Sequence, residues 1–201
     1  MRFDLQVVAS WIEPGAKVLD LGCGGGVLME HLAREKGVRA TGIENSEEKV
    51  AECLSKGLSV LHGDINEEVL DYSDNAFDYV ILSQTLQQVY DPARIIGQML
   101  RIGSRGIVSF PNFSHIGIRL QLMLGGRSPI SKELPYDWFD TPNIRVITIK
   151  DFRRFCKKLG VDIQAEVATR TPHQEEQGKL VHLLPNLRAI YGIFLLGRQE
   201  G

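Results

Sequence analysis

Cysteine is scarce in this sequence, and its scarcity excludes several kinds of site. The 201 residues include three cysteines, and none of them belongs to a CxxC pair. Neither a structural zinc site nor a thioredoxin-like redox motif is therefore indicated, and no metal is expected. A sparse, odd cysteine count is more typical of a reducing compartment than of a secreted, disulfide-stabilised protein, so we expect a cytoplasmic location.

The chain also lacks long apolar runs, a leader-like start and an excess of positive charge. Its apolar stretches, such as 190–196, are too short to cross a bilayer, and its first residues lack the apolar core of a signal peptide. The formal net charge is -2, and the basic residues form no stripe. We therefore expect neither nucleic acid nor a membrane as a partner.

The sequence does contain a regular alternation of short apolar runs with helix-like segments. This alternation predicts an α/β fold that is doubly wound, with a mostly parallel seven-stranded sheet covered by helices on both faces. Strands are expected at 17–21, 39–44, 59–62, 77–82, 106–110, 161–167 and 189–196, and helices at 27–36, between 46 and 57, between 91 and 103, and at 148–159. Ser46 is expected to cap the second of these helices, and Val50, Cys53 and Leu54 to form its apolar face.

The chain length suits one domain, 1–201. A single segment interrupts the alternation of expected strands and helices. Residues 112–145 carry two adjacent glycines, three prolines and a cluster of aromatic residues. The segment follows the expected fifth strand, where ligands sit in open sheets, so we expect a lid-like insertion at about 112–147. Tyr136, Asp137, Trp138 and Asp140 are candidates for an acceptor-side surface. The alternatives are an excursion that covers one sheet edge and an aromatic loop anchored in the core.

A glycine-rich loop joins the first expected strand to the first expected helix. Glycines at 22, 24 and 26 permit a tight turn, close approach of a ligand to the backbone, and close contact between helix and strand. The spacing is GxGxG, whereas dinucleotide-binding loops are typically GxGxxG. Asp20, at the end of the strand, would repel a pyrophosphate but would suit the amino group of a methionine-derived ligand.

Two further acids stand at the ends of the next two expected strands. Glu44 can accept hydrogen bonds from both hydroxyls of a ribose, and Asp64 can meet an adenine amino group while Ile65 lies on the ring. Each acid has an ordinary alternative: Asp20 as a turn residue, Glu44 as a helix-cap acid and Asp64 as a loop N-cap. Their shared position at three successive strand ends favours one ligand, S-adenosylmethionine (SAM).

These segments resemble the motifs of the class I SAM-dependent methyltransferases. Residues 18–26 resemble the first motif, 42–44 the second, 63–65 the adenine-contact motif and 77–83 the motif on the central strand. The resemblance implies SAM as the cofactor and a Rossmann-like fold. The expected cofactor-binding residues are Asp20, Gly22, Cys23, Gly24, Gly26, Glu44, Asp64, Ile65 and Ser83.

Three more segments, 82–87, 106–113 and 134–144, resemble a narrower family, the methionine biosynthesis proteins called MetW. The likeness extends from about 18 to 160. It implies a role in methionine biosynthesis and a partner, homoserine O-acetyltransferase, whose activity the family supports in some bacteria.

Three hypotheses follow for function. The chain is a SAM-dependent methyltransferase of a small molecule, a SAM-binding partner of homoserine O-acetyltransferase, or a dinucleotide oxidoreductase, which the loop spacing and Asp20 disfavour. No catalytic residue is assigned: His115 and His173 are candidate bases, although His115 could instead cap or pack, and Cys23 is expected to pack. The first strand is expected near Lys17, so a lid would have to come from 112–145 or from a partner.

Overall fold

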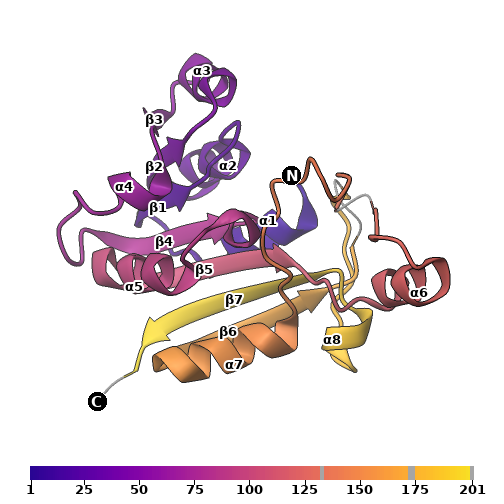
Figure 1. The fold of residues 1–201 in the computed structure, drawn as a ribbon. Helices are drawn as coiled ribbons and strands as arrows, with labels where there is room; N and C mark the ends of the chain where they lie inside the picture. Colours follow the sequence, from indigo (N-terminus) through magenta and orange to yellow (C-terminus); the bar gives the residue numbers. More distant parts are fainter. Residues whose placement is uncertain (132–133, 172–174, 200–201) are drawn as a thin grey trace.

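The computed structural model describes residues 1–131, 134–171 and 175–199. They form a seven-stranded sheet in the order β3-β2-β1-β4-β5-β7-β6 (Figure 1). The strands are β1 Lys17–Leu21, β2 Arg39–Glu44, β3 Ser59–His62, β4 Phe77–Ser83, β5 Gly103–Pro111, β6 Val161–Thr169 and β7 Tyr191–Arg198. Strands β1 to β5 pair in parallel, and β7 runs antiparallel to both β5 and β6. The predicted fold class is confirmed.

Helices cover both faces of this sheet. They are α1 Phe3–Trp11, α2 Val27–Lys36, α3 Glu47–Ser55, α4 Ile65–Glu68, α5 Pro92–Ile102, α6 Ile116–Gly125, α7 Ile149–Leu159 and α8 Pro185–Arg188, with a 3-10 turn, η1, at Leu86–Gln88. Successive residues of β1 face opposite layers, as the two-residue period of a strand requires. Val18 belongs to the apolar cluster that includes α1 and α2, and Leu19 to the cluster that includes α5 and α7.

The helix ends show where local sequence rules hold. Asp91 caps α5 by accepting a hydrogen bond from the Arg94 amide at 3.0 Å. Ser46 does not cap α3 with its side chain, so that prediction is wrong. Leu54 is also 59% exposed rather than packed against the sheet, whereas Cys53 is fully buried.

Helix α1 was not expected, because the segment before the first strand is short. Leu5, Val8, Ala9 and Ile12 are spaced to share one helical face, and all four are buried. They pack in the same cluster as α2, which means that the segment before β1 is part of the core. This apolar spacing is the signal in the sequence that indicates the helix.

The segment between β5 and α7 contains helix α6, which stands away from the sheet (Figure 1). His115 precedes the helix, and Gly126 ends it in a left-handed conformation with a φ of 59°. None of the residues of α6 is buried, although most of them are apolar. A helix of this length usually depends on packing for its stability, so the bare face of α6 is unusual.

Candidate functional site

A cavity of about 400 Å³ lies at the carboxyl ends of β1, β2, β3 and β4. The strand order reverses between β1 and β4, which is where ligands bind in open α/β sheets. The lining residues are Gly22, Glu44, Asn45, Gly63, Asp64, Ile65, Asn66, Ser83, Gln84, Thr85, Gln88, Val89 and Tyr90. The structure thus brings Gly22, Glu44, Asp64, Ile65 and Ser83 together, as the sequence predicts. The other four predicted binding residues, at 20, 23, 24 and 26, stand next to this lining in β1 and the glycine loop.

Two glycines of the loop occupy places that a larger residue could not. Gly22 has a φ of +76°, and a Cβ there would lie 2.8 Å from the Thr85 hydroxyl oxygen. Gly26 has a φ of +72°, and a Cβ there would lie 2.4 Å from a methyl carbon of Leu58. Since non-glycine residues rarely adopt this backbone region, the two positions depend on glycine for both conformation and space.

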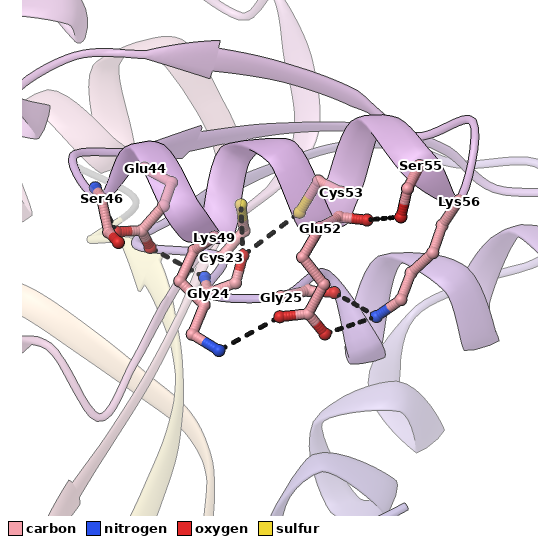
Figure 2. A network of polar contacts seen from close by, with 10 residues as sticks. All are labelled: Cys23, Gly24, Gly25, Glu44, Ser46, Lys49, Glu52, Cys53, Ser55 and Lys56. Atoms are coloured by element: carbon pink, nitrogen blue, oxygen red, sulfur yellow. Dashed lines mark hydrogen bonds and ion pairs between the residues drawn. The ribbon is translucent and has the colours of Figure 1, made fainter.

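Helix α3 holds the glycine loop from outside (Figure 2). The Cys53 thiol donates to the Gly24 carbonyl at 3.2 Å, and the Lys56 ammonium donates to the Gly25 carbonyl at 2.6 Å. Lys56 also pairs with Glu52 at 2.9 Å, and Glu52 in turn with Lys49 at 3.1 Å. Contacts within the chain therefore stabilise the conformation of the loop.

Glu44 ties the end of β2 to the same loop. Its Oε2 accepts a hydrogen bond from the Gly24 amide at 2.9 Å, and its Oε1 accepts from the amides of Asn45 and Ser46 at 3.0 Å each. A carboxylate offers about four lone-pair sites, so these three bonds leave capacity for a hydroxyl of a ligand. Its predicted alternative as a cap acid is also partly realised, because it satisfies amides that precede α3.

Asp20 is the most perturbed acid of the site. It is 3% exposed, and its Oδ1 has no hydrogen-bond partner among the described residues. Burial, with a further contribution from the charge of Glu44, raises the pKa of Asp20 to about 7. A buried carboxylate without a partner is costly, and a cationic group beside it would remove that cost. SAM carries such a group, so the residues present fit this ligand.

Cys23 packs behind the loop, as predicted. Its thiol lies 3.7 Å from the Gly24 carbonyl. Burial, followed by the nearby charge of Asp20, raises the pKa of the Cys23 thiol well above its ordinary value. The thiolate is the nucleophilic form of cysteine, so this environment disfavours a nucleophilic role.

The remaining predicted residues have local partners as well as places in the cavity wall. Asp64 caps α4, since its Oδ1 accepts from the amide of Asn66 at 2.8 Å and from its side chain at 2.7 Å. The loop N-cap alternative is thus realised, although Asp64 still lines the cavity. Ser83 shares a hydrogen bond of 2.9 Å with the hydroxyl of Ser109, and Ile65 is half-buried at the cavity edge.

Most of the lining that the sequence did not predict comes from the segment after β4. Gln84, Thr85, Gln88, Val89 and Tyr90 line the cavity together with the residues 63–66 that follow β3, and we call these five residues the outer wall. The MetW-like segment 82–87 marks the start of this wall, but no local pattern indicates that its residues face a ligand.

Helix α1 contacts this wall through one hydrogen bond, although none of its residues lines the cavity. Gln84 has a left-handed backbone, with a φ of 54°, and its side-chain amide donates to Asp4 of α1 at 2.7 Å. Asp4 is buried and is also paired with Arg2 at 3.0 Å.

The candidate base His115 and the candidate acceptor-side residues do not line this cavity. His115 Nδ1 accepts from the Gly117 amide at 3.2 Å and so caps α6, whereas His173 lies outside the described residues. Tyr136, Asp137, Trp138 and Asp140 are exposed, and none of them lines the cavity. Over the described ranges, no group of three or more histidines, cysteines or acids is placed to hold a metal ion. The described helices are all too short or too polar to cross a membrane.

The fold is shared with solved SAM-dependent methyltransferases. One from Thermotoga maritima superposes with a TM-score of 0.69 at 19% identity and covers 98% of this chain and 88% of its own. One from Mesorhizobium loti gives 0.68 at 20% identity and covers 96% of each chain. The cyclase SpnF gives 0.67 at 18% identity and covers 98% of this chain and 81% of its own. The class is therefore that of the SAM-dependent methyltransferase fold, which also hosts other chemistry.

The chain belongs to the MetW family of methionine biosynthesis proteins, whose family model matches residues 2–196. The bifunctional methionine biosynthesis protein MetXA/MetW of Rhodopirellula baltica is 36% identical over 176 residues, which are 83% of this chain and 28% of that protein. A ubiquinone biosynthesis O-methyltransferase of Methylococcus capsulatus is 29% identical over 74% of this chain and 64% of its own length. The chain thus spans between about a quarter and two thirds of these two relatives, and it is a MetW-like protein of methionine biosynthesis.

Proposed function

We propose that this chain is a SAM-binding subunit that supports homoserine O-acetyltransferase in methionine biosynthesis. One observation carries the proposal: the Rhodopirellula relative joins a MetW part, which this chain matches, to a part named MetXA. We take the MetXA part to correspond to the acetyltransferase. Fusion of two activities in one chain favours a working association between the separate proteins, because a linker keeps joined modules at high effective concentration.

In this proposal the cavity holds SAM through the residues at the four strand ends. Asp20 accepts from the amino group, Glu44 accepts from a ribose hydroxyl, and Asp64 meets the adenine amino group while Ile65 lies on the ring. The unpartnered oxygen of Asp20 and the remaining lone-pair site of Glu44 support these roles. The backbone at the remaining binding positions approaches the ligand closely; these are Gly22, Cys23, Gly24, Gly26 and Ser83.

The exposed apolar residues of the segment 112–147 support a partner. Leu124 is 78% exposed, Met123 71% and Trp138 75%. Exposed apolar patches of this kind mark interaction sites in soluble proteins. We therefore propose that the lid-like segment of this single domain faces the acetyltransferase rather than closing over the SAM cavity.

The alternative is a methyltransferase that acts on a small molecule without the partner. The ubiquinone biosynthesis O-methyltransferase relative favours it. Methyl transfer from SAM can proceed largely by positioning, so the absence of histidine, lysine and cysteine among the cavity-lining residues does not exclude it. Among the described lining residues, the candidate bases for a methyl acceptor are the carboxylates of Glu44 and Asp64 and the phenol of Tyr90.

Two measurements test the proposed function. Titration calorimetry should show binding of SAM and no binding of NAD. Co-expression with homoserine O-acetyltransferase should yield a complex in which acetylation is faster than with the acetyltransferase alone. Separate elution together with unchanged acetylation rates would remove the partner role. Turnover of SAM to S-adenosylhomocysteine with a defined acceptor would establish the alternative.

A further inference from the structure

Two buried residues that do not line the cavity hold its outer wall in place. Leu86 and Gln87 sit within the wall segment but are 1% and 5% exposed, and neither lines the cavity. The two point into the protein while Gln88, Val89 and Tyr90 line the cavity. The wall therefore has an inner, buried layer with contacts of its own.

Gln87 makes hydrogen bonds in two directions. Its side-chain amide donates to the carbonyl of Gln84 at 2.6 Å, and so closes the turn in which Gln84 adopts its left-handed backbone. Its own carbonyl accepts from the amides of Ile144 and Arg145 at 3.0 Å each. One buried residue thus connects the wall to the end of the segment 112–147.

Arg145 fastens the same wall at a second point. Its Nε donates to the carbonyl of Val89 at 3.4 Å, and its Nη2 donates to the carbonyl of Tyr90. Both of these acceptor residues line the cavity. Segments 82–87 and 134–144, two of the three that carry the MetW resemblance, therefore meet at this wall.

We propose that Gln87 is a positioning residue for SAM, and that it links the SAM cavity to the segment 112–147 through its bonds to Ile144 and Arg145. This inference rests on the proposed binding of SAM in the cavity. Gln87 acts through Gln84 and the wall, and it does not touch the ligand. Coupling between two sites is reciprocal. A ligand that stabilises the outer wall therefore also stabilises the position of residues 144–145, and a partner that holds residues 144–145 increases the affinity for the ligand.

A substitution at Gln87 can separate an effect on SAM affinity from an effect on the stability of the fold. Its Oε1 is buried and has no hydrogen-bond partner among the described residues. Gln87→Met keeps the length of the side chain, removes this unpartnered oxygen and also removes the bond to Gln84. Loss of one hydrogen bond and relief of one unpartnered buried atom act in opposite directions on stability. We therefore expect an unchanged melting temperature together with about 3- to 10-fold weaker SAM binding.

Gln87→Glu provides a graded second variant, because it places a carboxylate oxygen against the carbonyl of Gln84. SAM binding should weaken further than in Gln87→Met. Arg145→Ala tests the outer fastening without altering a buried residue, and Arg154→Ala is its control. Arg154 is exposed on α7, and no hydrogen bond or ion pair joins it to the described residues of the wall. We expect about 2- to 5-fold weaker SAM binding for Arg145→Ala and no change for Arg154→Ala.

Calorimetry with SAM tests the positioning role of Gln87, and amide hydrogen exchange tests its link to residues 144–145. In the unaltered chain, SAM should slow exchange at the amides of Ile144 and Arg145. Equal SAM affinity for the unaltered chain, Gln87→Met and Arg145→Ala would overturn the positioning role, and so would exchange at 144–145 that is indifferent to bound SAM. Failure of the unaltered chain to bind SAM would instead overturn the proposed function, and this inference with it.

Discussion

The glycine-loop side of the candidate site and the segment 112–147 are built in opposite ways. On the glycine-loop side, carbonyls and an amide of the loop are bonded to Cys53 and Lys56 at the end of α3 and to Glu44 (Figure 2). The apolar side chains of β1 are fully buried. The segment 112–147 contributes no residue to the cavity lining and carries α6, which buries none of its residues. The first region is complete within one chain, whereas the second lacks a surface to pack against.

This difference separates a ligand-binding function from a partner-binding function within one domain. The loop side needs only a small cationic ligand, because among the described residues its buried side-chain oxygen without a partner lies on Asp20. The 112–147 side needs a large apolar contact, which a small molecule cannot supply. Variants on the two sides should therefore affect different measurements.

The largest effect is expected on the apolar side. Leu120 and Leu124 are 41% and 78% exposed and lie four residues apart on α6, so they share a face. Leu120→Glu combined with Leu124→Glu should weaken binding to the acetyltransferase about 1000-fold, since burying two unpaired charges in an interface costs about 4 kcal/mol. Pull-down and calorimetry measure this, and SAM binding should not change.

The matched control places the same charges on the loop side. Leu54 and Leu61 are 59% and 40% exposed, on α3 and β3. Leu54→Glu with Leu61→Glu should leave acetyltransferase binding intact. Equal loss of binding in both double variants would show that added charge, rather than the α6 surface, is responsible.

The next effect belongs to the loop side. Glu44→Ala removes the proposed acceptor for the ribose and leaves three backbone amides without their partner. Charge-assisted hydrogen bonds contribute about 1.5–3 kcal/mol, so SAM should bind about 10- to 150-fold more weakly by calorimetry. Acetyltransferase capture through α6 should persist. Unchanged SAM affinity in a folded variant would place the ribose elsewhere.

A pH dependence follows from Asp20. Its pKa is raised from 3.8 to about 7, so the folded chain holds this proton more tightly than the unfolded chain does. The associated stability is fully present below about pH 4 and is lost as the pH rises through about 7. SAM binding has the opposite sign, because the amino group favours the charged carboxylate, and affinity should rise about 5- to 25-fold between about pH 5.5 and 7.5.

Asp20→Asn supplies the control for this pH dependence. An amide cannot titrate in this range, so both slopes should flatten, and SAM should bind the variant more weakly at about pH 7.5 than it binds the unaltered chain. Thermal unfolding and calorimetry across the pH series measure the two slopes. A slope that survives in Asp20→Asn would assign the titration to another group.

The contrast also shows what sequence could and could not predict. Strand ends and their acids are local features, so Asp20, Glu44 and Asp64 were placed at one sheet edge from alternation alone. The outer wall depends on contacts between distant positions, such as Gln84 with Asp4, eighty residues away. No local pattern encodes such a pair.

Exposure is equally difficult to infer from sequence, because an apolar helix is normally a core helix. The apolar residues 116–124 would ordinarily predict burial, yet the structure leaves them bare. Conversely, the short stretch before β1 was not expected to form a helix, and it contributes Leu5, Val8, Ala9 and Ile12 to the core. Both outcomes are decided by which surfaces remain to be covered once the sheet has formed.

The smallest expected effect on SAM affinity tests whether the buried contacts of the glycine loop hold it without its surface contact. Lys56→Ala removes one donor to the Gly25 carbonyl, while the Cys53 thiol and Glu44 still hold Gly24. Because Lys56 is partly exposed and screened by solvent, SAM affinity should fall only about two- to threefold, and less at high salt. Lys49→Ala is the control, since Lys49 pairs with Glu52 but does not touch the loop. A tenfold loss in Lys56→Ala alone would mean that the loop depends on this surface contact. The glycine-loop side and the segment 112–147 would then differ less in construction than their buried contacts indicate.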